Sequence, residues 1–209
     1  MNFLAHAYLS GSDENIIVGN FIADHVKGKA VERYSEKIMA GIRLHRRIDA
    51  FTDLHPVFRK STARLRESYG RYSGVIVDMF YDHFLARNWS NYSAVPIRQF
   101  TSGIYKVVMR HFLILPPKTR RILPFMAADD WLAGYAYLEG LNLALNGMSH
   151  RTNFKSGMEH AVEALKKDYD LFKTEFEEFF QDLRQDTMLF FEENGFLSDD
   201  RSRLNTNSR

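Results

Sequence analysis

The chain has 209 residues, of which 45% are hydrophobic and 26% are charged, and its formal net charge is +2. These proportions exclude a disordered chain and a membrane protein, and they predict a soluble protein with a full hydrophobic core. Cysteine is absent, which excludes disulfides, thiolate nucleophiles and cysteine-ligated zinc, so any metal must bind nitrogen and oxygen atoms. No apolar run reaches the length of a membrane span and the first residues do not resemble a signal peptide, so we expect a cytoplasmic protein.

The charges are distributed unevenly along the chain. Residues 1–121 contain 19 Lys and Arg against 10 Asp and Glu, whereas residues 122–209 contain 9 against 16. A basic half suits an anionic substrate or an acidic partner. The alternative is that the two halves neutralise each other within the fold, and the charge pattern alone does not decide between them.

Apolar residues recur at helical spacing in almost every segment of the first half, which predicts an all-α fold. Ser12 or Asp13 is placed to cap the second helix, although β-branched residues leave a strand open there. Gly70 closes the fourth helix, and residues 27–29 are expected to form a loop. We expect helices over residues 2–9, 14–26, 35–52, 56–69 and 73–88.

Prolines divide the second half. Pro96 is expected to begin a helix that Pro116 and Pro117 end, and a further helix is expected over residues 129–147. Residues 155–193 form a long amphipathic stretch, and residues 198–209 form a polar tail that we expect to be disordered. The sequence therefore predicts one all-helical domain over residues 1–197.

Titratable residues interrupt the apolar faces of the first two helices. His6 lies in an otherwise apolar helix, and Asn20 and Asp24 are the only polar side chains in the run that ends at Asp24. A carboxylate on a buried face is costly unless it is paired or bound to a cation. The simpler interpretations are a hydrogen-bonded core histidine at position 6, and an Asp24 that caps the next element or pairs with Lys27.

The third helix carries His45 and Asp49 one turn apart on an aliphatic face. The two side chains could chelate one ion, or Asp49 could fix the tautomer of His45. Arg46 and Arg47 flank them, and they could bind phosphate oxygens or pair with neighbouring carboxylates.

The fifth helix carries Asp78, Asp82 and His83. Two carboxylates one turn apart repel each other unless a cation lies between them, which favours a metal. Oxygen and imidazole ligands suit manganese, magnesium or iron, with zinc as a further option. Such a site could ionise a water molecule and bind a phosphoryl group, which is the chemistry of metal-assisted hydrolysis.

Several motifs resemble those of the acyl carrier protein phosphodiesterase family. The motifs are Asn2-Phe3-Leu4-Ala5-His6, Gly19-Asn20 with Ala23-Asp24, Gly41-Ile42 with His45-Arg46-Arg47-Ile48-Asp49 and Thr52-Asp53, Asp82-His83-Phe84-Leu85 with Trp89, and Leu145-Asn146-Gly147-Met148-Ser149 with Arg151. The resemblance implies an all-helical domain related to the HD-domain metal-dependent phosphohydrolases. It also implies removal of 4′-phosphopantetheine from holo-acyl carrier protein, with manganese as the usual cofactor and a place in fatty acid metabolism.

The resemblance further implies roles for individual residues. The expected metal ligands are His6, Asp24, His45, Asp82 and His83. It places Asp78 and Asp49 close to these ligands. From the residues themselves, we expect Asp78, Asp49 and Arg46 to act in catalysis, with Asp78 as an extra ligand or a base that holds the attacking water. We expect Arg43, Arg47 and Arg151 to bind substrate. The dyad of HD-domain enzymes reads His-Asp, whereas this chain has Asp82-His83, so ligand roles do not transfer directly from those enzymes.

The acyl carrier protein that the resemblance implies as substrate is acidic, so we expect a basic surface to dock it, and we expect neither a nucleic-acid nor a membrane partner. The candidate surface, whose alternative is a merely solvated helix face, consists of Arg43, Arg46, Arg47, Arg59, Lys60 and Arg64. Two other functions remain open: a related hydrolase of a small phosphoester or nucleotide, and a helical binding module whose His and Asp residues form a buried network. The enzyme hypothesis requires His6, Asp24, His45 and Asp82 to converge on one cation.

Overall fold

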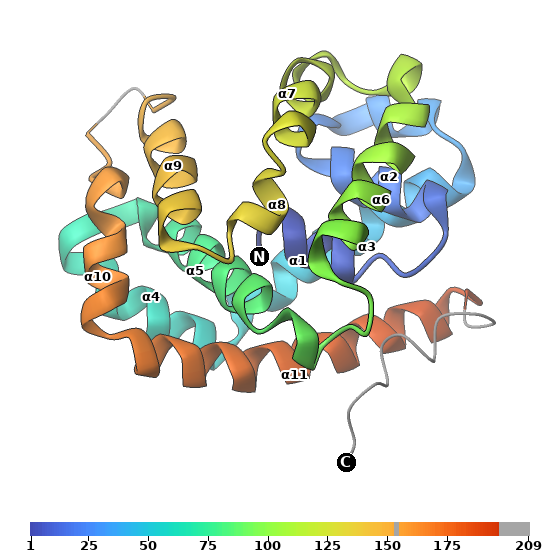
Figure 1. Cartoon of the computed structure of the whole chain (residues 1–209). Coiled ribbons are helices and arrows are strands. Elements are labelled where there is room, and N and C mark those ends of the chain that lie inside the picture. Colours follow the sequence, from blue (N-terminus) through green and yellow to red (C-terminus); the bar gives the residue numbers. More distant parts are fainter. Residues whose placement is uncertain (153–154, 197–209) are drawn as a thin grey trace.

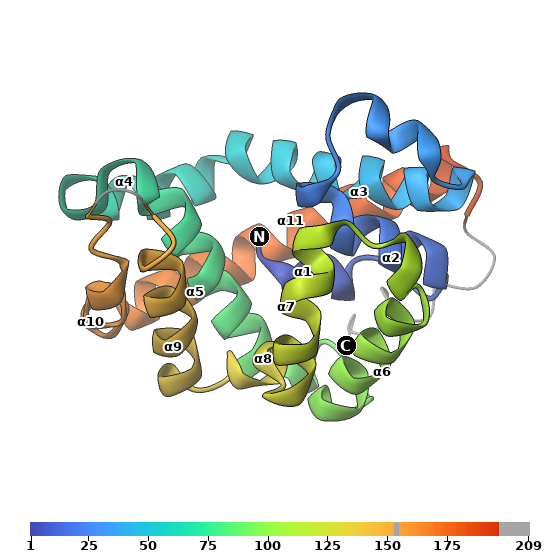
Figure 2. The same cartoon turned by 90° about the horizontal axis from the view of Figure 1, so that it is seen from above.

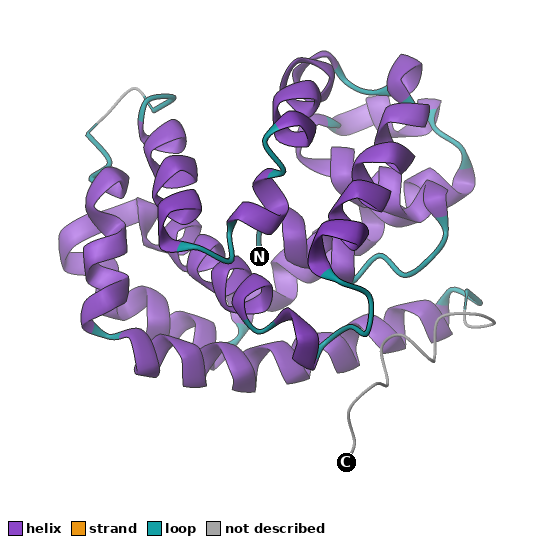
Figure 3. Ribbon diagram, viewed as in Figure 1, coloured by secondary structure: helices purple, strands orange, loops and turns teal. Residues whose placement is uncertain are grey.

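The computed structural model describes residues 1–152 and 155–196, and all of their regular secondary structure is helical (Figure 3). The prediction of an all-α domain is therefore confirmed. Within these residues, no helix combines the length and the hydropathy needed to cross a membrane. The polar tail expected over residues 198–209 lies outside the described residues.

The first half of the chain folds into helices close to those expected. Asn2 caps the first helix by accepting the backbone N–H of Phe3, and Asp13 caps the second. Gly70, with φ +51°, closes the fourth helix as predicted. The helices are α1 (Phe3–Tyr8), α2 (Glu14–Ile22), α3 (Glu36–Leu54), α4 (Pro56–Tyr69) and α5 (Ser73–Arg87).

The segment between α2 and α3 differs from the expectation. The second helix ends at Ile22 and continues as a short 3₁₀ helix, η1 (Ala23–His25), before the backbone becomes extended at Val26. A second 3₁₀ helix, η2 (Gly28–Arg33), replaces the predicted loop. Asp24 thus lies on a tight turn beside the end of α2.

The second half contains more helix breaks than the sequence indicated. Pro117 begins a helix instead of ending one, because proline fits the first turn of a helix. The helix predicted over residues 129–147 is interrupted after Gly134, where a Cβ on Gly140 would lie 2.2 Å from the Gly134 carbonyl oxygen. The predicted stretch over residues 155–193 breaks at Asp168. The helices are α6 (Ile97–Arg110), α7 (Pro117–Ala128), α8 (Trp131–Gly134), α9 (Leu138–Ser149), α10 (Ala161–Lys167) and α11 (Tyr169–Glu193).

Helices α2 and α3 make the most extensive helix contact in the described residues. A Cβ on Gly19 would lie 2.0 Å from the carbonyl oxygen of Ile38, and one on Gly41 would lie 2.2 Å from that of Ile16. The two backbones therefore touch directly, which only glycine permits. This contact fixes the position of α3, the helix that carries His45, relative to α2.

The long helix α11 lies along one side of the molecule and contacts α3, α4 and α5 (Figures 1 and 2). Its apolar face buries Phe172, Phe176 and Phe179 completely. Its acidic residues pair with basic residues of the first half, as in the contact of Glu175 with Arg64 at 2.7 Å. For such pairs, acidic residues of the second half of the chain neutralise basic residues of the first half within the fold.

Candidate metal centre

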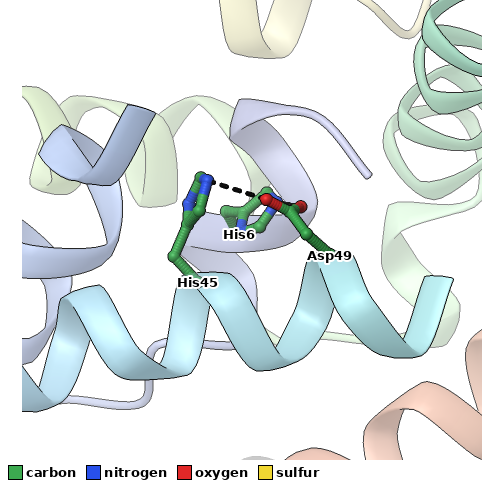
Figure 4. A group of neighbouring side chains, drawn as sticks. All are labelled: His6, His45 and Asp49. Atoms are coloured by element: carbon green, nitrogen blue, oxygen red, sulfur yellow. Dashed lines mark ion pairs between the residues drawn. The ribbon is translucent and has the colours of Figure 1, made fainter. Parts of the chain in front are cut away.

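Three side chains from two helices form a compact group (Figure 4). His6 projects from α1, and His45 and Asp49 project from α3. Each offers a ligand atom, and these atoms lie within 4.8 Å of one another. The carboxylate of Asp49 bridges the two rings, with Oδ1 3.2 Å from His6 Nε2 and Oδ2 3.1 Å from His45 Nε2.

Asp24 brings a second carboxylate to this group. Its Oδ1 atom lies 3.2 Å from His45 Nε2. The side chains of Asp24 and Asp49 are 64% and 45% exposed, whereas those of His6 and His45 are 5% and 9% exposed. The nitrogen atoms therefore lie on the protein side of the group and the carboxylates on the solvent side, where a substrate can approach.

The start of α1 is held by a carboxylate on α5. Asp82 accepts the backbone N–H groups of Asn2, Leu4 and Ala5 at 2.8 to 3.3 Å. These are the donors that a helix leaves unpaired in its first turn, so Asp82 anchors α1. Burial raises the pKa of Asp82 to about 7, despite the nearby Met1 ammonium and these donors. Since His6 lies on this one short helix, Asp82 determines where His6 is placed.

The pKa values of the two histidines in the group shift in opposite directions. Burial lowers the pKa of His6 to about 4. Burial also acts to lower the pKa of His45, but hydrogen bonds to Asp24 and Asp49 outweigh it and raise that pKa to about 9. The same contacts hold the pKa of Asp49 well below its usual range, although burial opposes this, and that of Asp24 is lowered chiefly by His45. At neutral pH the group therefore carries two carboxylates against one imidazolium.

One buried atom of the group lacks a hydrogen bond. Among the described residues, none forms a hydrogen bond with His6 Nε2, although Asp49 Oδ1 lies 3.2 Å away. A buried polar atom without a partner is costly. A neutral imidazole nitrogen with a free lone pair, facing a carboxylate, is a standard ligand arrangement for a divalent metal.

The spacing of the ligand atoms provides a second test of this fit. Ligands that bind one ion at about 2.1 Å, with angles between them of roughly 90 to 110°, lie about 3.0 to 3.4 Å apart. The nitrogen-to-oxygen separations are 3.2 Å from His6 to Asp49 Oδ1, 3.1 Å from His45 to Asp49 Oδ2 and 3.2 Å from His45 to Asp24 Oδ1. The residues present therefore fit a divalent metal with nitrogen and oxygen ligands.

Two further expected ligands and one expected catalytic residue are not brought into this group. Asp82 binds the backbone of α1, and His83 contacts the Tyr135 carbonyl oxygen at 2.7 Å and the Tyr169 hydroxyl at 2.9 Å through its two ring nitrogens. Asp78 accepts a hydrogen bond from the Met1 ammonium at 2.7 Å. These contacts occupy the side chains. Of the four residues expected to converge on one cation, His6, His45 and Asp24 therefore meet, whereas Asp82 anchors α1.

The expected substrate-binding arginines are mostly engaged elsewhere. Arg43 pairs with Glu36, Arg47 binds Asp186 through two hydrogen bonds of 2.9 Å, and Arg151 donates to the Gly147 carbonyl oxygen. Arg64 and Lys60, expected in a docking surface, both contact Glu175. Arg46 is exposed, follows His45 on α3 and donates to the Val26 carbonyl oxygen at 3.4 Å. Of the arginines expected to bind substrate or act in catalysis, Arg46 is thus the one that contacts the segment following Asp24.

Asn20 contacts both histidines, although the sequence pattern predicts no role for it. Its Oδ1 atom lies 2.9 Å from His6 Nδ1 and 3.0 Å from His45 Nδ1. The available signal was its place as one of two polar side chains in an apolar run, one helical turn before Asp24. That spacing indicates a shared helix face but does not reveal which residues lie opposite.

Comparisons with known proteins agree in the family they indicate. The family model described as acyl carrier protein phosphodiesterase matches residues 1–183. A protein of Serratia proteamaculans with that name is 30% identical over 186 residues, which cover 88% of this chain and 96% of the relative. One from Escherichia coli O45:K1 is 33% identical over 181 residues, covering 86% and 94%. A search of solved structures gives no match.

Proposed function

The chain belongs to the acyl carrier protein phosphodiesterase family, and we propose that it is a metal-dependent hydrolase of holo-acyl carrier protein. In the proposed reaction, a water oxygen attacks the phosphorus that joins 4′-phosphopantetheine to a serine of the carrier protein. The bond between phosphorus and the serine oxygen breaks, and that oxygen takes a proton. The products are 4′-phosphopantetheine and the apo-carrier protein.

The observation that carries this proposal is the meeting of His6, His45 and Asp49 with Asp24 at the protein surface. We propose that these four side chains bind one divalent metal, with manganese expected and magnesium, iron or zinc also compatible with the donor atoms. When bound, the metal supplies Lewis-acid polarisation of a phosphoryl oxygen and activation of water. Two ionised carboxylates offset the charge of such a cation.

The remaining roles follow from position. The nitrogens of His6 and His45 bind from the buried side, while Asp24 and Asp49 face solvent and can orient the attacking water. Arg46 is exposed, contacts the Val26 carbonyl oxygen close to Asp24 in the sequence, and is proposed to bind a non-bridging phosphoryl oxygen. Asp78 is neutralised by the Met1 ammonium, so we give it no part in holding water.

Docking of an acidic carrier protein requires exposed cations near the metal centre. Among the six residues first expected for this, Arg47 and Arg64 pair with α11. Lys27 and Lys118 are both exposed. Their segments lie side by side near Asp24, because a hydrogen bond of 2.7 Å joins His25 to Thr119 at the start of α7. We propose that the carrier protein approaches over this side, where charge attraction increases the rate of encounter.

The proposal is tested by treating holo-acyl carrier protein with metal-depleted enzyme, with and without added Mn²⁺, and measuring the protein mass. We expect loss of the phosphopantetheine mass with Mn²⁺ alone, and elemental analysis should show bound metal. A panel of nucleotides and small phosphoesters provides the comparison. Turnover of the small esters alone would contradict the carrier-protein substrate, and full activity without metal would contradict the metal centre.

The binding-module alternative makes the opposite prediction. It requires the His and Asp residues to be a structural network, so His45→Gln should leave any partner binding intact and no metal should bind. Retained fold with lost metal and lost activity in His45→Gln would support the enzyme and exclude the module.

A further inference from the structure

We propose that Asn20 is a positioning residue that sets the tautomers of His6 and His45 together, so that both rings present a free Nε2 lone pair to the metal. This inference rests on the proposed metal centre but can be tested without metal. It assigns to one amide the orientation of two ligands that come from different helices.

The amide oxygen of Asn20 serves both rings. Oδ1 lies 2.9 Å from His6 Nδ1 and 3.0 Å from His45 Nδ1, and the residue is only 1% exposed. An amide oxygen is solely an acceptor and has two lone pairs. Each pair therefore accepts one N–H, which requires the proton of each neutral ring to be on Nδ1.

The backbone of α1 fixes which way the amide points. Asn20 Nδ2 donates to the carbonyl oxygen of His6 at 3.1 Å. A flipped amide would place its oxygen against that carbonyl oxygen, and it would place its NH₂ group against both rings. Such a flip would replace a hydrogen bond by a contact between two acceptors, which disfavours it. The His6 carbonyl thus determines the orientation of Asn20, and Asn20 determines both tautomers.

The consequence appears on the other edge of the rings. A neutral imidazole with its proton on Nδ1 has a bare lone pair on Nε2, the atom that faces Asp49 in both histidines. In a neutral ring of the opposite tautomer, the proton on Nε2 would occupy the position where that nitrogen must bind the metal. Because the rings stack with an interplanar angle of 24°, one acceptor can align both.

The close contact of α2 with α3 leaves this amide little freedom. The backbone nitrogen of Asn20 would lie 2.8 Å from a Cβ on Gly41, one turn before His45. Asn20 therefore stands where the two helix backbones touch, and its short side chain reaches both rings. A ligand-orienting hydrogen bond of this kind typically changes metal affinity about 10- to 100-fold when it is removed.

The test uses protein labelled with ¹⁵N-histidine, free of metal, and long-range ¹H–¹⁵N NMR spectra that report which ring nitrogen carries the proton. His6 is assigned by comparison with His6→Gln. We expect the proton of His6 on Nδ1 in the parent and on Nε2 in Asn20→Leu, which has a similar volume but no acceptor. Asn20→Asp keeps an acceptor oxygen and should retain the Nδ1 proton. Asn88→Leu removes an asparagine whose side-chain amide donates to the Phe84 carbonyl oxygen, away from the histidines, and serves as the matched control.

Mn²⁺ affinity, measured by electron paramagnetic resonance, provides the second readout. We expect a 10- to 100-fold loss in Asn20→Leu, little loss in Asn20→Asp, and no change in Asn88→Leu. A parent spectrum with the His6 proton on Nε2 would overturn the inference without any variant, as would an unchanged tautomer in folded Asn20→Leu. If the tautomer switches as expected but the parent binds no metal, the positioning role stands and the proposed function fails.

Discussion

The imidazole rings of His6 and His45 stack with their centroids 4.0 Å apart, although one belongs to α1 and the other to α3. Two positive rings at this distance would repel each other. The surroundings of the two rings avoid this repulsion, because they shift the two pKa values in opposite directions. Burial lowers the pKa of His6 to about 4, while hydrogen bonds to the two carboxylates overcome burial and raise that of His45 to about 9. In the metal-free protein, the proton of His45 therefore offsets part of the carboxylate charge that a divalent cation would neutralise.

This charge state predicts how the stability of the metal-free protein depends on pH. The pKa of His45 is higher in the folded state than the value of 6.5 in the unfolded chain, so protonation favours folding. The contribution, on the order of 3 kcal/mol, is fully present below about pH 6.5 and is lost as pH rises through about 9. Urea unfolding in EDTA should show a larger difference between the parent and His45→Gln at pH 6 than at pH 10.

His160→Gln is the control for that experiment, because the His160 side chain is 80% exposed. Its effect on the free energy of unfolding should be small at both pH values. A difference between the parent and His45→Gln that stays the same at pH 6 and pH 10 would contradict a protonated His45 in the folded, metal-free protein.

Asp49 and Asp53 offer a matched pair for metal binding, since both lie on α3 one turn apart and only Asp49 contacts the histidines. Mn²⁺ at about 100 times its dissociation constant should stabilise the parent by about 2.7 kcal/mol, which raises Tm by roughly 5 to 10 °C. We expect Asp53→Asn to keep this shift and Asp49→Asn to lose most of it. Differential scanning calorimetry with and without Mn²⁺ measures the effect, and equal shifts in both variants would place the metal elsewhere.

The sequence predicted the parts of the site that depend on local helix geometry. His45 and Asp49 converge because residues four apart share a helix face, which the pattern showed directly. Asp82 and His83 diverge because adjacent residues point about 100° apart, so one reaches the start of α1 and the other reaches Tyr135. The sequence offered no means of deciding which of the two would reach α1, or of showing that neither would join the two histidines.

The limits of the fold prediction have a similar origin. The pair of prolines before α7 is compatible with either the end or the start of a helix, and periodicity does not distinguish the two. The break after Gly134 depends on a close backbone approach by Gly140, which is a tertiary contact. Likewise, the role of Asn20 depends on a helix that lies opposite, so composition and spacing could mark the residue but not its partners.

The glycine contact between α2 and α3 predicts a strong effect of one methyl group. In Gly41→Ala, the new Cβ would lie 2.2 Å from the Ile16 carbonyl oxygen, so the helices must separate. We expect a loss of roughly 2 to 3 kcal/mol in the free energy of unfolding, and weaker Mn²⁺ binding because Asn20 and His45 move apart. Gly103→Ala is the control, since nothing lies within 4 Å of its Cβ and alanine favours a helix by up to about 1 kcal/mol. Urea unfolding followed by circular dichroism should separate the two, and equal stability would contradict the close contact.

Arg46 and Arg47 are neighbours on α3, but Arg46 is exposed whereas Arg47 is paired with α11. We therefore expect replacement of Arg46 to reduce activity and replacement of Arg47 to reduce stability. Arg47 binds Asp186 on α11 through two hydrogen bonds of 2.9 Å, so Arg47→Ala should cost about 1 to 2 kcal/mol of stability and leave KM for holo-acyl carrier protein unchanged. Arg46 is exposed and is proposed to bind a phosphoryl oxygen, so Arg46→Ala should lower kcat/KM at least about tenfold with little change in stability. Steady-state kinetics and thermal unfolding of the two variants measure both effects. A raised KM in a fully stable Arg47→Ala would return Arg47 to the substrate-binding role expected from the sequence, and it would show that the pairing with α11 opens when the carrier protein docks.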